Sequence, residues 1–313
     1  MIGIDVGGAN LKVVDSNGVH IHYCPMWEEA PLETLLAGYR SPDDEDAAVV
    51  MSGELADCFD SKIEGIRFIV EAVKSVFPKA IFYGTDGRFH HEPVPGLAAA
   101  NWLASADLLR KDWPDRVLVD MGSTTTDIIP LTDFPSLLGM TDLVRLQKGY
   151  LVYCGLLRTS VPTVIHHASL GGIQTPVSPE YFACSGDVHL ALGHITPTEY
   201  TSDTPDGKSR EPEAAYRRLA RVVCADLSEI GIEGAMTIAR TFWEAQRSLL
   251  KNTIEEVMSG SGATGVITAG VGSRLMAGVT GGTDISGRLG PFSDALPAFA
   301  VREVALRNAG CSD

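Results

Sequence analysis

Short apolar runs open the chain and predict three strands. Ile2–Val6, Leu11–Val14 and Val19–Tyr23 each have the length of a strand, and Ser16-Asn17-Gly18 is a hairpin signal between the last two. Connections this short join strands that run in opposite directions. The pattern therefore predicts an antiparallel meander at the start of the chain.

Strands and helices are predicted in alternation after this meander. Ala47–Met51 is a continuous apolar run typical of a buried strand, and Ala80–Tyr83 is another. Between them, apolar residues recur at helical spacing from Ile63 to Phe77, and Pro78 marks the end of that helix. An alanine-rich helix over Leu97–Leu109 completes a first lobe.

A second lobe begins at Arg116, where a strand, a turn and a strand occur again. Helices are expected to start at Ser178-Pro179-Glu180 and at Glu211-Pro212-Glu213, because proline is favoured at the first helical position. Two longer helices and a glycine-rich strand and turn follow, over Gly231–Met258, Asp294–Asn308 and Gly265–Gly272. We therefore predict two α/β lobes, residues 1–114 and residues 115–313, the second with helical insertions.

The two lobes open with the same motif. Ile2-Gly-Ile-Asp5-Val-Gly7-Gly8 matches Val117-Leu-Val-Asp120-Met-Gly122-Ser123, so that in each lobe an aspartate ends a strand and small residues reverse the chain. Glycine lets the backbone N–H groups of such a turn approach a phosphate, because no Cβ intervenes and positive φ angles are allowed. Either turn alone is equally typical of an ordinary tight turn. The pair predicts a phosphate site between the lobes.

The polar groups around both turns suit phosphate and a metal ion. Lys12 would place a cation against a phosphate. Asp5 and Asp120 would face each other across the cleft and hold Mg²⁺ through its waters, so that these two and Lys12 are catalytic candidates. The phosphate-binding candidates are Gly7, Gly8, Ala9, Asn10, Gly122, Ser123, Thr124, Thr125 and Thr126.

This arrangement resembles the ribonuclease H-like superfold of actin, Hsp70 and sugar kinases, in which two duplicated α/β lobes enclose a cleft. Ile267-Thr-Ala-Gly270-Val-Gly272-Ser273-Arg274, a strand that passes through glycines into a helix, resembles the adenosine-side motif of that superfold. Gly270 and Gly272 are therefore substrate-binding candidates, although the same pattern also occurs where a strand and a helix simply pack closely.

Composition narrows the class of partner. The 313 residues are 45% hydrophobic, enough for two domains with cores of their own, and 40 acidic against 25 basic residues give a net charge of −15. Such a surface repels nucleic acid and anionic lipid. The six cysteines are scattered, as is typical of reduced thiols, and neither a signal segment nor a membrane span is expected. We expect a cytoplasmic enzyme that acts on small molecules, and the composition is compatible with a homo-oligomer.

Longer stretches resemble the hydantoinase/oxoprolinase-related family, in its branch linked to one-carbon transfer on tetrahydromethanopterin. The stretches that carry the resemblance are Asp5–Lys12, Ser52–Asp57, Ala99–Ala104, Asp120–Asp127, Tyr153–Thr159 and Asp187–His189. The resemblance implies a transferase in which an aminomethylfuran-methanol diphosphate alkylates the phenol of γ-glutamyltyramine and pyrophosphate leaves. Its implied partners are that diphosphate and a phenolic acceptor.

For this chemistry the phenol needs a general base, because its ordinary pKa is about 10. Asp187 and His189 are the candidates, although such a pair on a helix is more often solvated or capping. Further candidates for substrate binding are Glu54, Asn101, Tyr153 and Arg158, each of which ordinary packing or capping would also explain.

Two other functions fit the same phosphate motifs. One is an ATP-dependent kinase or ATP-coupled hydantoinase/oxoprolinase-like enzyme, with ATP held at the glycine turn around Gly270. The other is a non-catalytic nucleotide sensor of the actin and Hsp70 type, in which closure of the lobes is the function. ATP is possible as a ligand but not favoured, because the family resemblance extends beyond the phosphate turns.

Overall fold

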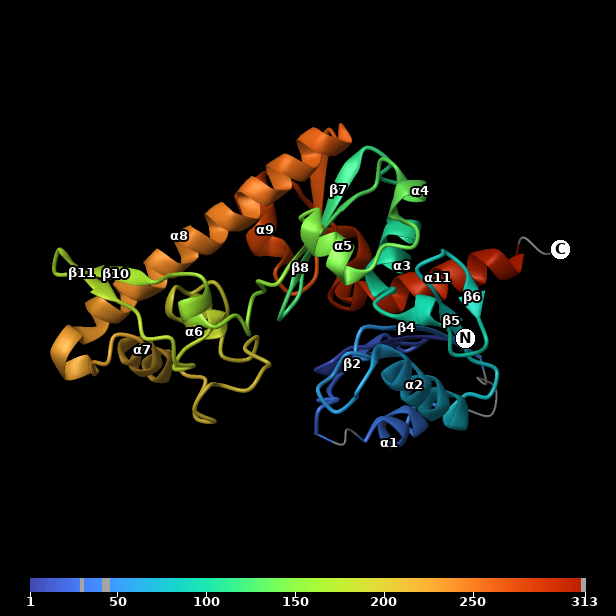
Figure 1. The fold of residues 1–313 in the computed structure, drawn as a ribbon, viewed down its shortest axis with the longest axis horizontal. Coiled ribbons are helices and arrows are strands. Elements are labelled where there is room, and N and C mark those ends of the chain that lie inside the picture. Colours follow the sequence, from blue (N-terminus) through green and yellow to red (C-terminus); the bar gives the residue numbers. More distant parts are fainter. Residues whose placement is uncertain (29–30, 41–45, 311–313) are drawn as a thin grey trace.

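The two larger sheets in the described part of the chain share one connectivity (Figure 1). The structure, a computed structural model, describes residues 1–28, 31–40 and 46–310. In the first sheet, β1 lies between β2 and β4 and the order is β3-β2-β1-β4-β5-β6. β1, β2 and β3 are antiparallel, whereas β1, β4 and β5 are parallel. The strands are β1 (Ile2–Val6), β2 (Asn10–Val14), β3 (Val19–Tyr23), β4 (Ala47–Met51), β5 (Ile81–Tyr83) and β6 (Phe89–His90).

The second sheet repeats this plan, in the order β9-β8-β7-β12-β13. Again the first three strands in sequence are antiparallel and the first, fourth and fifth are parallel. The strands are β7 (Arg116–Met121), β8 (Thr126–Pro130), β9 (Leu151–Val152), β12 (Gly265–Ala269) and β13 (Thr283–Asp284). This order and these directions, found twice, confirm the predicted two-lobed ribonuclease H-like fold.

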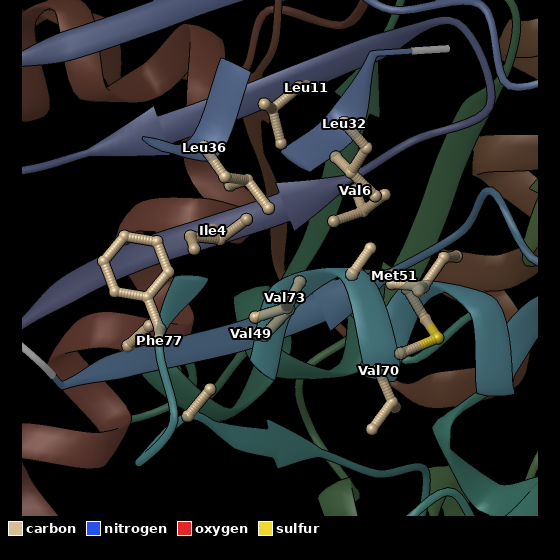
Figure 2. Packing of buried hydrophobic residues seen from close by; sticks show 14 of the residues in the cluster. Ile4, Val6, Leu11, Leu32, Leu36, Val49, Met51, Val70, Val73 and Phe77 are labelled. Atoms are coloured by element: carbon tan, nitrogen blue, oxygen red, sulfur yellow. The ribbon is translucent and has the colours of Figure 1, made fainter. Parts of the chain in front are cut away.

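The first lobe is held together by apolar residues on one face of its sheet. Helix α2 (Lys62–Val76) begins at Ser61, whose hydroxyl accepts the N–H of Glu64, and its apolar residues recur at helical spacing. Val70 and Val73 of this helix meet Val49 and Met51 of β4, and helix α1 (Leu32–Ala37) covers the neighbouring strands (Figure 2).

Two helices, α3 (Asn101–Leu109) and α11 (Leu296–Gly310), pack together and join the lobes. Their apolar residues form one buried cluster with β4 of the first sheet and with β7 and β12 of the second. Helix α11 lies directly on β1, since a Cβ on Gly3 would stand 2.0 Å from the carbonyl oxygen of Ala298. The boundary predicted at residues 114 and 115 stays a prediction, and α11 packs on both lobes.

A large insertion projects from the second lobe (Figure 1). It is built on the long helix α8 (Leu227–Ser261). The N-terminal half of α8 belongs to a separate hydrophobic core. The other elements of the insertion are β10 (His167–Leu170), β11 (Ile173–Pro176), α6 (Ser185–Ala191) and α7 (Pro212–Arg221). The expected helix start at Ser178-Pro179-Glu180 is wrong. The backbone N–H of Ser178 donates instead to Val222 O at 2.7 Å, and the capping groups of Cys184 and Asp187 start α6.

Short helices complete the structure. They are η1 (Pro95–Leu97), α4 (Phe134–Leu137), α5 (Asp142–Gln147), η2 (Val161–Thr163), α9 (Ser273–Thr280), α10 (Ser286–Leu289) and η3 (Gly290–Ala295). Within the described ranges, no helix combines the length and hydrophobicity needed to cross a bilayer.

Candidate active site

The two hairpins that open the lobes have the same geometry. The N–H of Gly7 donates to the carbonyl of Asn10 at 3.0 Å, and the N–H of Gly122 donates to the carbonyl of Thr125 at 2.9 Å. Each bond closes a four-residue turn between the strand that carries the aspartate and the next strand. The two turns thus present equivalent loops.

An aspartate precedes each turn, and the surroundings of both carboxyl groups disfavour the negatively charged form. Burial raises the pKa of Asp5 to about 6, with Lys12 acting in the opposite direction. Burial, together with the charge of Asp127, raises the pKa of Asp120 to about 7. Asp5 Oδ1 is buried and has no hydrogen-bond partner among the described residues. The site therefore favours an added cation or proton.

Asp127 completes this acidic group from the strand next to Asp120. The two are cross-strand partners on β7 and β8, so their side chains lie on the same face of the sheet. Asp127 forms an ion pair with the buried Arg145, which also donates to Asp142 at 2.7 Å and stacks on Trp102 at 4.4 Å. Burial still raises the pKa of Asp127.

A cleft of about 1770 Å³ lies beside these turns and receives residues from both lobes and from the insertion. Because it is far larger than the space that packing leaves inside a core, it is the candidate binding site. Seven of the predicted site residues line it: Asn10, Lys12, Asp120, Gly122, Ser123, Gly270 and Gly272.

Gly270 and Gly272 lie at the cleft for a steric reason. A Cβ on Gly270 would stand 2.3 Å from Asp120 Oδ1, and this residue has a φ of +77°. A Cβ on Gly272 would stand 2.5 Å from the sulfur of Met121. The turn can approach the end of β7 only because both residues lack a side chain.

The other residues of the two turns do not line the cleft. In the first turn, the carbonyls of Gly8 and Ala9 accept the N–H groups of Met26 and Cys24, each at 2.9 Å, while Gly7 lies against Gly53. In the second turn, Gly155 packs against the backbone of Ser123 and Thr124, and Thr125 closes the turn. A phosphate-binding role for Gly7, Gly8, Ala9, Thr124 and Thr125 stays a prediction.

The phosphate-binding prediction for Thr126 is wrong. Thr126 is fully buried and its hydroxyl donates to Cys154 O at 2.7 Å. The side chain of a strand residue points to the face opposite that of its neighbour, so Thr126 points away from Asp127 and the cleft.

Asp187 is a structural residue, contrary to its predicted catalytic role. It is fully buried, where Arg218 donates to its Oδ1 at 2.8 Å and Tyr200 donates at 3.2 Å. It also accepts the N–H of Cys184 in the cap of α6. This carboxylate has its hydrogen-bonding capacity used inside the protein and does not reach the cleft.

His189 lies two residues further along α6, is also fully buried, and does not line the cleft either. Burial lowers its pKa to about 3, which makes the ring neutral at physiological pH. Its two nitrogens contact His194 and Gln246. The predicted direct role in catalysis is therefore wrong.

The structure does not bring the four remaining substrate-binding candidates into the cleft. Glu54 is buried, with one carboxyl oxygen lacking a hydrogen-bond partner among the described residues, and Asn101 is the first residue of α3. Tyr153 is 71% exposed on the surface. Arg158 stacks on Trp27 of the first lobe, 5.0 Å from the ring.

The sequence analysis missed a cleft wall formed by α8 and the loop after α6. Trp243, Arg247 and Lys251 follow one another at a spacing of four residues on α8, and all three line the cleft together with His194. The spacing was a usable signal, because side chains four residues apart share one face of a helix. Asp284 and Asp294, which also line the cleft, follow no motif that the sequence analysis recognised.

The residues present fit a Mg²⁺ ion held partly by its substrate. No cluster of three metal-binding side chains occurs in the described parts of the chain, so the protein alone does not supply a full coordination shell. Two carboxylates, one of them with an unpartnered buried oxygen, match the usual protein contribution to Mg²⁺, which keeps waters and takes phosphate oxygens.

Comparison with known proteins identifies the family. The model of the hydantoinase/oxoprolinase family matches residues 45–305. The chain belongs to the hydantoinase/oxoprolinase family. This member is 35% identical over 288 residues to a (4-{4-[2-(gamma-L-glutamylamino)ethyl]phenoxymethyl}furan-2-yl)methanamine synthase of Methanocaldococcus jannaschii, with 88% of this chain and 87% of that protein covered.

A Methanococcus vannielii protein of the same name is 36% identical over 160 residues, 51% of this chain and 72% of that protein. Both relatives are synthases, and the first covers 88% of this chain, so the assignment of this family member as an enzyme is confirmed. The non-catalytic sensor is therefore not favoured. Its cytoplasmic location stays a prediction.

Solved structures resemble this family member only at low identity. Nucleotide-free acetone carboxylase matches 93% of this chain and 51% of its own, with a TM-score of 0.45 and 11% identity. A non-polymerising MamK mutant bound to AMPPNP matches 99% and 98% of the two chains, with a TM-score of 0.39 and 14% identity. No ligand or activity follows from these for this chain.

Proposed function

We propose that this enzyme forms the phenoxymethylfuran ether of a methanofuran-type cofactor. An aminomethylfuran-methanol diphosphate would be the donor, and the phenol of γ-glutamyltyramine the acceptor. The family relationship supports this, since the two relatives are named for the synthesis of such an ether. The observation that carries it is the cleft, which Lys12, Asn10 and Ser123 line together with an aromatic and cationic wall on α8.

The turns would bind the diphosphate. Lys12, Asn10 and Ser123 line the cleft and offer an ammonium group, an amide and a hydroxyl to phosphate oxygens. As the C–O bond to the diphosphate breaks, negative charge grows on the leaving oxygen, and positioned cations and donors stabilise it. A Mg²⁺ ion bound near Asp5 and Asp120 would supply further neutralisation of the diphosphate.

The wall of the cleft on α8 would bind the acceptor. Trp243 offers a ring face or edge to the phenol ring, and Arg247 and Lys251, one and two turns along α8, offer cations to the one free carboxylate of the glutamyl group. A substrate of this length spans several helical turns, so a stripe of one aromatic and two cationic residues suits it.

The test is product formation with both substrates. The protein is mixed with the furan diphosphate, γ-glutamyltyramine and Mg²⁺, and the ether and pyrophosphate are measured by mass spectrometry and a coupled pyrophosphate assay. Equal amounts of ether and pyrophosphate are expected, without ATP. If a protein shown to be folded forms no ether, whichever of the two substrates is added first, the proposal is contradicted.

An ATP-dependent enzyme is the second candidate, because the glycine turn at Gly270 and Gly272 lines the same cleft. A thermal-shift comparison with Mg²⁺ distinguishes the two, since a ligand that binds only the folded state raises the melting temperature. Pyrophosphate is expected to stabilise the protein more than ATP or ADP. Selective stabilisation by ATP would favour the kinase-like function instead.

A further inference from the structure

A chain of hydrogen bonds runs from the cleft wall into the insertion. The Nδ1 atoms of His194 and His189 are 2.9 Å apart, and His189 Nε2 is 3.0 Å from Gln246 Oε1. Gln246 Nε2 in turn donates to the carbonyl of Gly155 at 3.0 Å. Of these residues, only His194 lines the cleft, where it is half-buried.

The far end of this chain fixes every proton in it. The carbonyl of Gly155 can only accept, so the amide atom of Gln246 that faces it must be the NH₂ group. Gln246 Oε1 then faces His189 and can only accept, which places a proton on His189 Nε2. His189 is fully buried and neutral, so its Nδ1 carries a lone pair. His194 must therefore donate from Nδ1.

This assignment leaves His194 Nε2 as a base. A neutral imidazole with its proton on Nδ1 has a lone pair on Nε2, and no hydrogen bond to that atom occurs among the described residues. Burial lowers the pKa of His194 from its ordinary value of 6.5, which favours the neutral form. When Nε2 takes a proton, the Nδ1–H donates to the lone pair of His189 and supports the new charge.

The surroundings of His194 suit an aromatic substrate. The ring centroid of Trp243 on α8 lies 5.1 Å from that of His194, edge to face, and Trp243 lines the cleft. The charged and titratable groups nearby are His189 on α6, Arg247 on α8, Arg274 on α9 and Glu199 in the loop. Arg274 donates to the backbone carbonyl of His194 and pairs with Glu199, so that it leaves the ring free.

We propose that His194 is the general base of the reaction, and that His189 and Gln246 are positioning residues that fix its tautomer. This inference rests on the proposed function. The phenol proton moves to His194 Nε2, the phenol oxygen forms the new bond to the furanylmethyl carbon, and the C–O bond to the diphosphate breaks with its electron pair. The proton on His194 then passes to solvent or to the departing pyrophosphate.

The kinetic test compares two acceptors. With γ-glutamyltyramine, His194→Gln is expected to lower kcat/KM by about 10²–10⁴-fold, the usual range for loss of a general base. With an acceptor whose ring carries fluorines beside the hydroxyl, the phenol ionises without help at pH 8.5, and the loss is expected to shrink to below about tenfold. An equal loss with both acceptors, or no loss with either, would overturn the role of His194.

Two controls separate this inference from the proposed function. His91→Gln changes a histidine on the exposed surface and is expected to leave both acceptors unaffected. If the wild-type protein forms ether and His194→Gln is equally active, the base assignment fails while the function stands. If the wild-type protein forms no ether, the function fails. Pyrophosphate stabilisation of His194→Gln should equal that of the wild type.

A measurement without turnover tests the tautomer itself. In ¹⁵N-labelled protein, two-bond ¹H–¹⁵N spectra of the imidazole rings distinguish the protonated nitrogen from the bare one. His194 is expected as the Nδ1–H form and His189 as the Nε2–H form, with the His194 signals identified by their absence in His194→Gln. An Nε2–H form of His194 would contradict the inference. Gln246→Met is expected to mix the two forms and to change the pH profile of kcat.

Discussion

Lys12 and Asp127 occupy the same position in the two duplicated hairpins. Lys12 is the cross-strand partner of Asp5, as Asp127 is the partner of Asp120. The duplication has kept the aspartate and reversed the charge of its partner. The first lobe thus presents a cation to the cleft, whereas in the second lobe Arg145 neutralises the extra acid.

Replacing Lys12 should weaken diphosphate binding. In Lys12→Met the cation that lowers the pKa of both Asp5 and Asp120 is lost, and a charge-assisted contact to phosphate disappears. Pyrophosphate binding with Mg²⁺, measured by calorimetry, is expected to weaken by about 10–100-fold. Lys74→Met, which removes a surface pair with Glu92, is the matched control and should bind normally. Equal affinity in both variants would contradict the role of Lys12.

Ser123 and Thr126 should respond in opposite ways to loss of their hydroxyl groups. Ser123→Ala removes a donor that lines the cleft, so pyrophosphate affinity should fall while the melting temperature changes little. Thr126→Val leaves the carbonyl of Cys154 unpaired in the core, which should cost about 1–3 kcal/mol of stability and no affinity. Chemical denaturation and pyrophosphate titration of both variants check this. A loss of affinity in Thr126→Val would restore its predicted phosphate role.

Gly270→Ala should damage the site. A Cβ would overlap Asp120 Oδ1, and the positive φ would strain any other residue, so a loss of both stability and activity is expected, with stability falling by at least about 1 kcal/mol. In Gly260→Ala, within α8, a Cβ would meet no atom within 4 Å, and this control should gain about 0.5–1 kcal/mol. Near wild-type activity in Gly270→Ala would show that the turn is not tightly held.

Stability should depend on pH through His189. Burial lowers its folded pKa to about 3, below the unfolded value of 6.5, so only the unfolded chain takes up this proton in that range. The contribution of His189 is present above pH 6.5 and is lost as the pH falls towards 3, at about 1.4 kcal/mol per pH unit. Denaturation at pH 7.5 and 5.0 should show a smaller pH effect in His189→Gln than in the wild type. Equal pH effects would mean that His189 is not buried as a neutral ring.

Asp187→Asn should unfold more easily without a specific catalytic defect. It removes the fully buried carboxylate that pairs with Arg218, which then keeps only the partly exposed Asp206, and loss of one partner of a buried pair costs about 3–5 kcal/mol. Activity per folded molecule, measured below the onset of unfolding, should remain near that of the wild type. A stable variant with much lower kcat would favour the catalytic role predicted from sequence.

Sequence patterns predicted the fold and the two duplicated hairpins well, because both depend on local signals. Asp5 and Asp120 lie near the ends of apolar strands, and a glycine turn follows each aspartate within two residues. The wall of the cleft on α8 was predicted poorly, because His194 and Trp243 come from a loop and a helix that only the insertion brings together. The prediction for Asp187 and His189 rests on residue type and on the family resemblance, whereas their buried contacts depend on Arg218 and Gln246, which lie far along the chain.

The packing of α11 on β1 constrains how the protein is made. β1 leaves the ribosome long before the helix that covers it, because Gly3 packs against Ala298, which lies far along the chain. Until α11 emerges, one apolar face of the first sheet is exposed to solvent, where it can aggregate or bind chaperones. We expect the first lobe to complete its folding only once α11 has emerged from the ribosome, so that a nascent chain stalled before α11 remains sensitive to protease.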